Sequence, residues 1–308
     1  MKPLGGYLSA VLSAVVLSFT SILISFLSVN WPMAPLVLAF WRCFFAALLL
    51  LPAFLFRSGL MKIRRGDIVY LILYGLLLAV FNSLWIPSVQ LNGAAVATVL
   101  LYCSAAFSAL LGWYLFKEVL GLVKITVVVL VLAGCFLVSG AMNGAAGVGI
   151  PGLVIGIFSG LGYAGYALMG RGAAVRGLDP WTTLFFTLVF SSVFLLLPNL
   201  LPLGLVPGNG DLLVLGSSLS GWGLVLLLAA GPTVLGYELF NISLVTLPSS
   251  VTNVVVSMEP AFTAVSAYLL LGERLGPPQI VGGVLILGGV VLLRLAPKTS
   301  NLSNESAA

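Results

Sequence analysis

Glu118-Val-Leu-Gly121 separates two apolar stretches of the chain, and the same arrangement returns near the C-terminus as Glu273-Arg-Leu-Gly276. The two glutamates lie 155 residues apart, and at the same offset Gly134 matches Gly289. A constant offset that holds without a gap over about two helices indicates an internal repeat. The sequence therefore predicts two copies of one unit, each ending in an apolar helix, a Glu-x-Leu-Gly turn and a last apolar helix.

The composition indicates where the chain folds. Of its 308 residues, 61% are hydrophobic and 7% are charged, and the mean hydropathy is +1.21. These values lie far outside the range of soluble globular domains, so an integral membrane protein is predicted. There is no His, and the three Cys stand singly inside apolar runs, which is typical of small core residues. No cofactor, no metal site and no nucleic-acid partner is therefore expected.

A helix needs roughly 20 apolar residues to cross a bilayer. Short breaks rich in Gly, Pro, Asn and Asp divide the chain into ten such spans, at about 6–28, 33–56, 68–90, 93–116, 121–141, 150–171, 180–198, 219–246, 249–271 and 278–296. An all-α fold of ten transmembrane helices is predicted, with the first repeat in 1–142 and the second in 148–297. Residues 298–308 form a short polar tail that is expected to be disordered.

The distribution of positive charge supports the ten spans. If Lys2 lies inside the cell, every Lys and Arg outside the spans falls on the inner side except Arg274. We therefore expect a multi-pass protein of the cell (inner) membrane with both termini cytoplasmic. Five spans in each copy also mean that the copies insert in opposite orientations, which is the inverted-repeat architecture of secondary transporters.

Several motifs resemble those of one known family. They are Phe40-Trp-Arg-Cys-Phe44 in the second span, Leu115-Phe-Lys-Glu118 and Leu270-Leu-Gly-Glu273 at the ends of the fourth and ninth, and Met258-Glu-Pro-Ala-Phe262. The whole chain resembles the EamA-type transporters of the drug/metabolite transporter superfamily. The first copy departs from the pattern, because Cys103-Ser-Ala-Ala106 replaces the last motif. The resemblance implies an exporter or exchanger of small metabolites, most often amino acids, and does not identify the substrate.

Away from the ends of the predicted spans, three ionisable side chains other than Tyr and Cys lie within them: Arg42, Glu238 and Glu259. A charged residue at a helix centre costs about 2.5–3.5 kcal/mol on translocon scales, so such residues usually face a cavity or a partner. Arg42 and Glu259 both lie near the middle of their spans and are able to pair. Arg42 is either a structural anchor or a counter-ion, for a substrate carboxylate or for Glu259.

Glu259 precedes Pro260, which removes one helical hydrogen bond and frees the carbonyl one turn back. A carboxylate beside a broken turn is a candidate cation or proton site, and the alternative is a structural Glu satisfied by the backbone and Arg42. Glu238 shares a helix face with Asn241. At the 155-residue offset, the counterpart of each acid in the first copy is a serine. The sequence therefore predicts that the buried acids belong to the second copy only.

Aromatic and amide side chains complete a candidate binding site. Their polar ends need partners inside the bundle, and their ring faces suit a small amphipathic solute, although packing within the core explains each of them as well. The candidate substrate-binding residues are Tyr74, Asn82, Trp85, Tyr163, Tyr166, Asn241 and Asn253.

A secondary transporter accounts for the repeat, the mid-membrane charges and the missing soluble domain together. A channel would need a continuous polar lining, and an enzyme would need a catalytic cluster that the motifs do not offer. The hypothesis is alternating access around a central site, driven by the solute gradient or by protons through Glu259 or Glu238. A channel-like facilitator and a multidrug or cationic efflux carrier stay open, as do the monomer and the homodimer.

Overall fold

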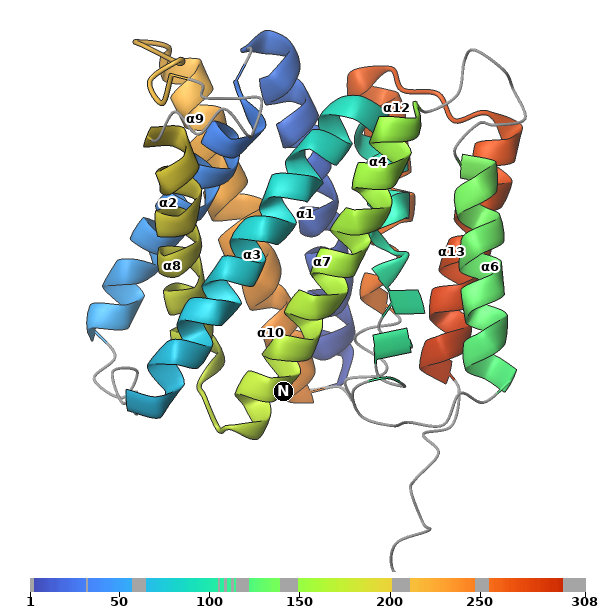
Figure 1. The fold of residues 1–308 in the computed structure, drawn as a ribbon, viewed down its shortest axis with the longest axis horizontal. Helices are drawn as coiled ribbons and strands as arrows, with labels where there is room; N and C mark the ends of the chain where they lie inside the picture. Colours follow the sequence, from blue (N-terminus) through green and yellow to red (C-terminus); the bar gives the residue numbers. More distant parts are fainter. Residues whose placement is uncertain are drawn as a thin grey trace, which may run out of the picture.

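The computed structural model is a bundle of helices that stand roughly side by side (Figure 1). It describes residues 3–31, 33–56, 65–104, 106–107, 110–111, 114, 122–138, 149–200, 211–246 and 255–295. Its helical segments are α1 Pro3–Asn30, α2 Pro35–Phe56, α3 Arg65–Asn92, α4 Ala94–Leu101, α6 Leu122–Val138, α7 Ile150–Val175, α8 Pro180–Leu200, α9 Leu219–Leu228, the π-helix η2 Ala229–Leu235, α10 Gly236–Thr246, α12 Glu259–Leu271 and α13 Pro277–Leu295.

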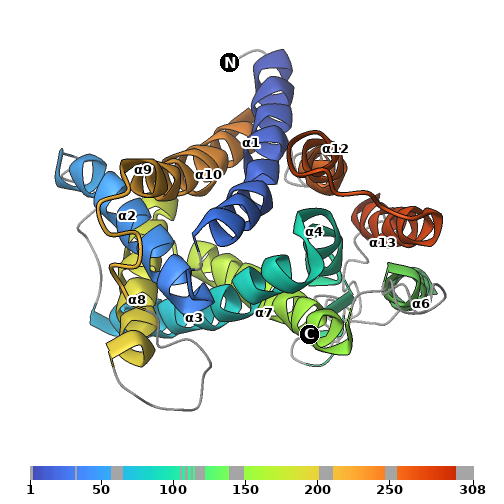
Figure 2. The same cartoon turned by 90° about the horizontal axis from the view of Figure 1, so that it is seen from above.

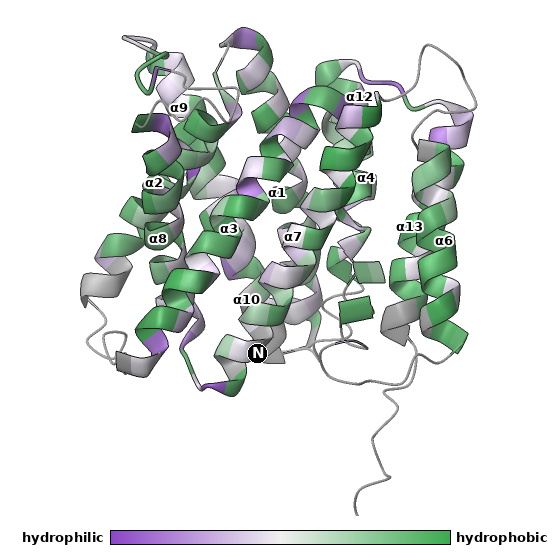
Figure 3. Ribbon diagram, in the orientation of Figure 1, coloured by the Kyte–Doolittle hydropathy of each residue, from purple (hydrophilic) through white to green (hydrophobic). Residues whose placement is uncertain are grey.

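These segments build ten helices, because α9, η2 and α10 follow one another without a gap. Six of the ten are long and apolar enough to cross a membrane on their own, and α6, α12 and α13 add shorter apolar segments. Most residues of the helices are hydrophobic (Figure 3), and many large apolar side chains are exposed, as expected where lipid replaces water. The prediction of an all-α membrane protein with ten helices is confirmed.

Local sequence determines where several helices begin and end. Asp179 accepts a hydrogen bond from the backbone N–H of Thr182 at the start of α8, and Ser218 accepts one from Gly221 at the start of α9. Both are side-chain caps of a helix N-terminus. Gly272 follows α12 with a φ of 69°, a left-handed conformation that glycine adopts without strain.

The first helices of the two halves run in opposite directions. Asn92, at the end of α3, donates a hydrogen bond to the carbonyl of Gly152 at the start of α7, with a separation of 2.9 Å. Tyr70, at the start of α3, donates to the carbonyl of Met169 near the end of α7. The helices α3 and α7 are therefore antiparallel. Since α1 runs in the direction of α3, α7 is inverted relative to α1, its counterpart in the first half (Figure 1).

The last helices of the two halves, α6 and α13, pack against each other through glycines. A methyl group added to Gly134 would lie 2.7 Å from the carbonyl oxygen of Gly282, and one added to Gly289 would lie 3.6 Å from that of Val127. Gly282 and Gly289 are the counterparts of Val127 and Gly134 at the 155-residue offset. The repeat therefore maps each of these two contacts onto the other. This relation is expected when two inverted halves are related by an approximate twofold axis.

The repeated glutamate has a structural role at Glu273. Its Oε1 accepts a hydrogen bond from the backbone N–H of Ala94 at 2.8 Å, and its Oε2 accepts one from Ala95 at 3.0 Å. The carboxylate therefore caps α4 directly after the turn at Gly93, whose φ is 78°. The predicted tight hairpin at 91–93 is thereby confirmed. Glu118, the hairpin at 247–248, the predicted boundaries at 142 and 148 and the tail 298–308 lie outside the described residues.

The cap makes a prediction for stability. Glu273→Gln replaces one carboxylate oxygen with an NH2 group, so the side chain no longer accepts from both backbone N–H groups, and the negative charge at the helix N-terminus is lost. We expect the free energy of unfolding to fall by about 1–2 kcal/mol. Thermal unfolding of the purified protein in detergent measures the change. Glu238→Gln, the same substitution on α10, is the control, and equal losses in the two variants would show that the cap contributes nothing special.

Candidate functional site

A cavity of about 260 Å³ lies in the middle of the bundle, between the two halves of the chain. The helices α1, α3, α7, α10 and α12 surround it when the molecule is seen along the helix axes (Figure 2). Its walls are formed by Leu17, Thr20, Arg42, Phe81, Trp85, Leu101, Tyr102, Ser104, Tyr163, Ala164, Ala167, Tyr237, Phe240, Val256, Glu259 and Val290.

Two interrupted helices reach the cavity from opposite halves. The helix α4 ends at Leu101 and is followed by a turn at Tyr102-Cys103, and a turn at Ser257-Met258 precedes α12. The two turns are counterparts at the 155-residue offset. Discontinuous helices at mid-membrane depth are a feature of transporter binding sites, because the broken turns expose polar groups to a cavity.

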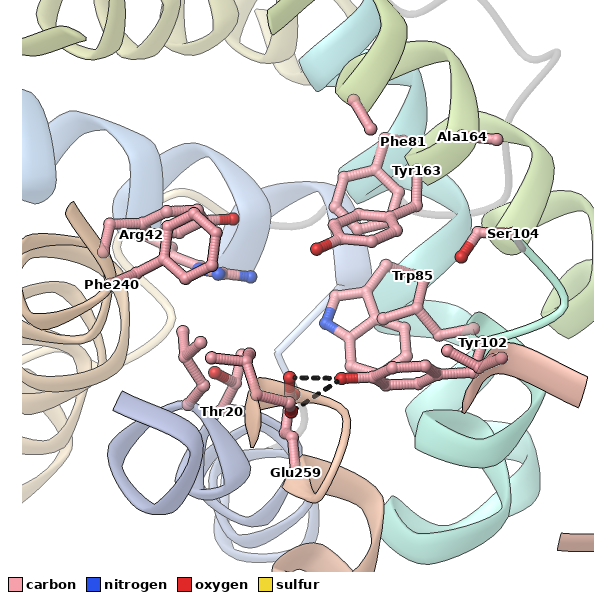
Figure 4. A pocket seen from close by; sticks show the side chains of 16 residues that line it. Thr20, Arg42, Phe81, Trp85, Tyr102, Ser104, Tyr163, Ala164, Phe240 and Glu259 are labelled. Atoms are coloured by element: carbon pink, nitrogen blue, oxygen red, sulfur yellow. Dashed lines mark hydrogen bonds between the residues drawn. The ribbon is translucent and has the colours of Figure 1, made fainter. Parts of the chain in front are cut away.

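Glu259 is the first residue of α12 and points into the cavity, where it meets Tyr102 from the other half (Figure 4). The Tyr102 hydroxyl lies 3.0 Å from Oε2 of Glu259 and 3.3 Å from the carbonyl oxygen of Val256. Val256 is the residue whose carbonyl loses its helical partner at Pro260. The predicted consequence of Pro260, a freed carbonyl one turn back, is therefore found, and Tyr102 lies within reach of both groups.

Arg42 faces Glu259 across the cavity (Figure 4). Its side chain is buried, and its partners are neutral: Nε donates to the Thr233 hydroxyl at 3.0 Å, and Nη1 donates to the Asn82 amide oxygen at 3.3 Å. Within the described part of the chain, no carboxylate forms a salt bridge with Arg42, and the pairing with Glu259 considered from the sequence is not formed. The guanidinium charge is thus held in place without being neutralised.

The π-helix η2 explains how Thr233 reaches Arg42. Pro232 lies inside η2 and has no N–H to donate, and the Thr233 hydroxyl donates to the carbonyl of Leu228, five residues back, at 3.0 Å. The hydroxyl oxygen is then available to accept from Arg42. A π-helix of this kind frequently marks a functional site, because its wider turn moves side chains out of the regular helical register.

Aromatic rings line one wall of the cavity. The rings of Phe81 and Trp85 on α3 are stacked with centroids 6.4 Å apart, and Tyr163 on α7 lies 5.6 Å from Phe81 (Figure 4). Trp85 and Phe240 are counterparts at the 155-residue offset, and so are Ser104 and Glu259. The scaffold of the cavity is therefore symmetric, whereas its acid is present in one half only.

The structure brings together part of the predicted site. Arg42, Glu259, Trp85 and Tyr163 line the cavity, and Asn82 lies behind Arg42. Tyr74 and Tyr166 pack on each other, with centroids 4.8 Å apart, and are outside the lining.

Three predicted residues have other positions. Glu238 is partly buried on α10 and is not among the lining residues, whereas its neighbours Tyr237 and Phe240 are. The structure describes only the backbone of Asn241, and Asn253 lies outside the described residues.

Sequence analysis missed several residues of the lining, among them Thr20, Tyr102, Tyr237 and Phe240. The repeat carried a signal for two of them. Tyr237 is the counterpart of Asn82, and Phe240 is the counterpart of Trp85, and both of these first-copy residues had been selected. The charged Glu238 next to them is the stronger signal in the sequence, and it lies outside the lining.

Another concave surface lies near the ends of α1 and α3 that are away from the N-terminus. There, a second hollow of about 480 Å³ is lined by Ser28 of α1 and Gln90 of α3, and Gln90 donates to the Ser28 hydroxyl at 2.9 Å. Ile24 lies on α1 between the cavity-lining Thr20 and Ser28, and Ile86 precedes Gln90 by one turn. Both isoleucines are fully buried and belong to one apolar cluster.

Comparison with known proteins agrees with this architecture. The sequence model of the EamA-like transporter family matches the chain twice, over residues 4–140 and 150–295. The chain belongs to the EamA-like transporter family. It is therefore a multi-pass membrane protein and a transporter rather than an enzyme. The two matched segments correspond to the two inverted halves of the structure.

Named relatives lie within the same family. The threonine/homoserine exporter RhtA of Escherichia coli (strain K12) is 29% identical over 82% of this chain and 81% of its own length. An uncharacterised transporter of Archaeoglobus fulgidus is 28% identical over 93% of this chain and 95% of its own. A solved crystal structure with 17% identity covers 93% of this chain and 95% of that chain with a TM-score of 0.61, which shows the same fold.

The contact between Thr233 and Arg42 makes a second prediction. Thr233→Val keeps the shape of the side chain and removes the acceptor of the Nε hydrogen bond. Because hydrogen bonds to charged groups contribute about 1.5–3 kcal/mol, we expect the free energy of unfolding to fall within that range. Thermal unfolding in detergent is the measurement. Thr126→Val on the exposed face of α6 is the matched control, since the Thr126 hydroxyl bonds only within its own helix. Equal stability of the two variants would contradict the contact.

Proposed function

We propose that the chain exports or exchanges small zwitterionic metabolites of the amino acid class, which it binds in the central cavity. In this proposal Arg42 binds the substrate carboxylate and Glu259 binds the ammonium group. One observation carries the proposal: a buried cation and a carboxylate face the same cavity from opposite sides and do not pair with each other. A zwitterion supplies both missing partners at once.

The surroundings of Arg42 favour an anionic ligand. A buried charge is costly unless it is paired, and the neutral oxygens of Thr233 and Asn82 orient the guanidinium without cancelling its charge. A carboxylate suits the planar guanidinium, because two parallel N–H···O bonds can form. Asn82 and Thr233 come from opposite halves of the chain, so both halves would hold the residue that binds the substrate.

The surroundings of Glu259 favour an amine. The Tyr102 hydroxyl lies 3.0 Å from Oε2, and a carboxylate has about four lone-pair sites, so acceptor sites remain for an ammonium group. The substrate ammonium and a proton would compete for this carboxylate. A carrier that returns with the proton after releasing the amine would exchange protons for substrate. Proton coupling is therefore part of the proposal, and Glu259 is its carrier.

The remaining walls bear on the size and polarity of the solute. A cavity of about 260 Å³ is smaller than most drug-binding pockets, which measure roughly 300–1,000 Å³, and favours one small molecule. The rings of Phe81, Trp85 and Tyr163 offer apolar contact to a side chain. The relative RhtA is named as a threonine/homoserine exporter, so these two amino acids belong in the first set of substrates to be tested.

The apolar layer at Ile24 and Ile86 favours alternating access over a channel. A continuous pore would need an open polar path. In this proposal the buried Ile24 and Ile86 close the cavity toward the second hollow. We propose that this layer and the bond between Gln90 and Ser28 form the gate that opens when the two halves rock. The state described would then face the side of the N-terminus, which we propose to be the cytoplasm.

A second candidate is an efflux carrier for cationic aromatic compounds. It is favoured by the combination of Glu259 with the ring faces of Trp85, Tyr163 and Tyr102, since aromatic faces attract cations. The two candidates differ at Arg42. A zwitterion needs the guanidinium, whereas a cation is repelled by it.

Arg42 tests the zwitterion proposal. Counterflow uptake by the purified protein in liposomes is measured with labelled threonine, homoserine and an aromatic amino acid, and with a cationic aromatic dye. For Arg42→Gln, we expect the KM for the transported amino acid to rise at least about tenfold, because losing one partner of a buried charge pair costs about 2–5 kcal/mol.

Two further comparisons make this test specific. Amino acid amides, which lack the carboxylate, should compete poorly with the wild type, and Arg42→Lys should recover part of the affinity. Arg176→Gln is the matched control, because Arg176 lies over the Tyr70 ring away from the cavity. An unchanged KM in Arg42→Gln would contradict the proposal, and uptake of the dye alone would favour the cationic carrier.

Substitution of Glu259 tests whether this residue carries the coupled proton. Because a protonated carboxyl does not pair with an ammonium group, we expect the KM of the wild type to rise as the pH falls. In Glu259→Gln the KM should be higher and independent of pH, and a pH gradient should no longer drive accumulation. Glu238→Gln, on the same half of the chain and outside the cavity lining, should keep the pH dependence of the wild type. If Glu259→Gln keeps it as well, Glu259 is not the proton carrier.

A further inference from the structure

A third and larger concavity opens on the outer surface of the bundle between α12 and α13. It measures about 700 Å³, and Val99 of α4 contributes to its wall. The side chains along it are apolar and well exposed: Val265 is 59% exposed, Leu269 is 70% exposed and Val284 is 63% exposed. In a membrane this surface meets lipid rather than water. The two helices that form it stand at the edge of the bundle (Figure 2).

A cation lies at one end of this groove. Arg274 belongs to the segment 272–276, which joins α12 to α13 and is hydrophilic, whereas the helices below it are hydrophobic (Figure 3). Arg274 is exposed and has no hydrogen-bonding or ionic partner among the described residues. Its neighbour Glu273 directs both oxygens to the backbone of α4, at Ala94 and Ala95. The positive charge of Arg274 is therefore available to a ligand.

We propose that this groove binds an anionic phospholipid, with the headgroup phosphate at Arg274 and an acyl chain between α12 and α13. The end of a transmembrane helix lies at the depth of the lipid headgroups, and the apolar groove extends from there toward the membrane centre. Basic residues between transmembrane helices bind anionic headgroups on the cytoplasmic side of membranes, and Arg274 offers the same chemistry at the opposite membrane surface. The chemistry of the groove, one cation followed by an apolar channel, matches that of one phospholipid.

The same features argue against a second copy of the chain as the occupant. In a twofold dimer the same patch meets itself, so two unpaired Arg274 side chains would approach each other across the interface. Like charges that face each other disfavour such a contact. A phospholipid brings the opposite charge instead.

The position of the groove connects the lipid to the transport cavity. Pro260 and Ala264 of α12 line the groove, whereas Glu259, the preceding residue, lines the cavity. A lipid chain would therefore pack on the back of the helix that carries Glu259. On its other side α13 is held by α6, where Gly282 meets Gly134. The lipid would fill the space that α13 leaves beside α12.

Lipid binding can be measured without knowing the transported substrate. The full-length protein is purified, stripped of lipid and titrated with phosphatidylglycerol or phosphatidylcholine of the same chain length, and bound lipid is counted by native mass spectrometry. We expect the wild type to bind phosphatidylglycerol about fivefold more tightly, the effect of one cation near an anionic headgroup. Arg274→Gln should remove this preference, and Arg274→Lys should keep most of it.

Two controls distinguish lipid binding in the groove from a non-specific electrostatic attraction between anionic lipid and the protein. Arg176→Gln removes the same charge on the segment after α7, outside the groove, and should leave the preference for phosphatidylglycerol unchanged. Val284→Trp fills the groove from an exposed position and should weaken the binding of both lipids at this site.

The proposal is overturned if the wild type shows no preference between the lipids, or if Arg176→Gln weakens binding as much as Arg274→Gln does. It is also overturned if the stripped protein dimerises and Val284→Trp, but not added lipid, dissociates the dimer, because the occupant would then be a second copy. None of these results depends on the proposed substrate.

Discussion

The fold depends on one constraint: inside a bilayer, each backbone N–H and C=O group must find a partner within the protein. An uninterrupted helix meets this requirement by itself, and a broken helix does not. This chain breaks its helices several times near the middle or the ends of the bundle, and at two of the described breaks the partner comes from elsewhere in the chain. Glu273 satisfies the start of α4, and Tyr102 approaches the carbonyl that Pro260 leaves free. Both partners come from the opposite half of the chain.

This exchange of partners explains why the two halves form one structure. A half by itself would leave Ala94 and Ala95 without an acceptor, or Val256 without a donor. The halves also meet at α6 and α13, where the repeat maps each of the two glycine contacts onto the other. These contacts between the halves occur at helix breaks, and the breaks at Tyr102 and Ser257 also border the cavity. Packing and cavity are therefore two results of one arrangement.

Much of this could be predicted from the sequence, since it depends on period and offset. Apolar length predicts the ten helices, and the 155-residue offset predicts which of them are counterparts. The Pro260 carbonyl could be predicted too, because proline removes a bond at a known position. The turn at Tyr102-Cys103 could not, since no proline marks it in the first copy. The repeat holds the only sequence signal, through its counterpart at Ser257-Met258.

The choice between Tyr237 and Glu238 shows a further limit. Neighbouring residues on a helix point in directions about 100° apart, so an error of one position turns a side chain away from the site. Next to these residues the π-helix η2 adds extra backbone to the turn, which changes the register that a regular helical pattern assumes. The hydropathy pattern of the sequence does not reveal this change of helical register. The partner of Arg42, Thr233, lies in the same π-helix and was missed for the same reason.

The charged residues make the cavity asymmetric, although the helices around it are related by the repeat. The offset relates Ser104 to Glu259, and it relates Arg42 to Leu197, so each charge has an uncharged counterpart in the other half. A symmetric pair of acids would repel each other within a small cavity, and a symmetric pair of arginines would do the same. One cation and one acid, each on a different half, avoid this repulsion. They also make the separation of the charges depend on how the halves are placed, so that a ligand that binds both is sensitive to any rocking between them.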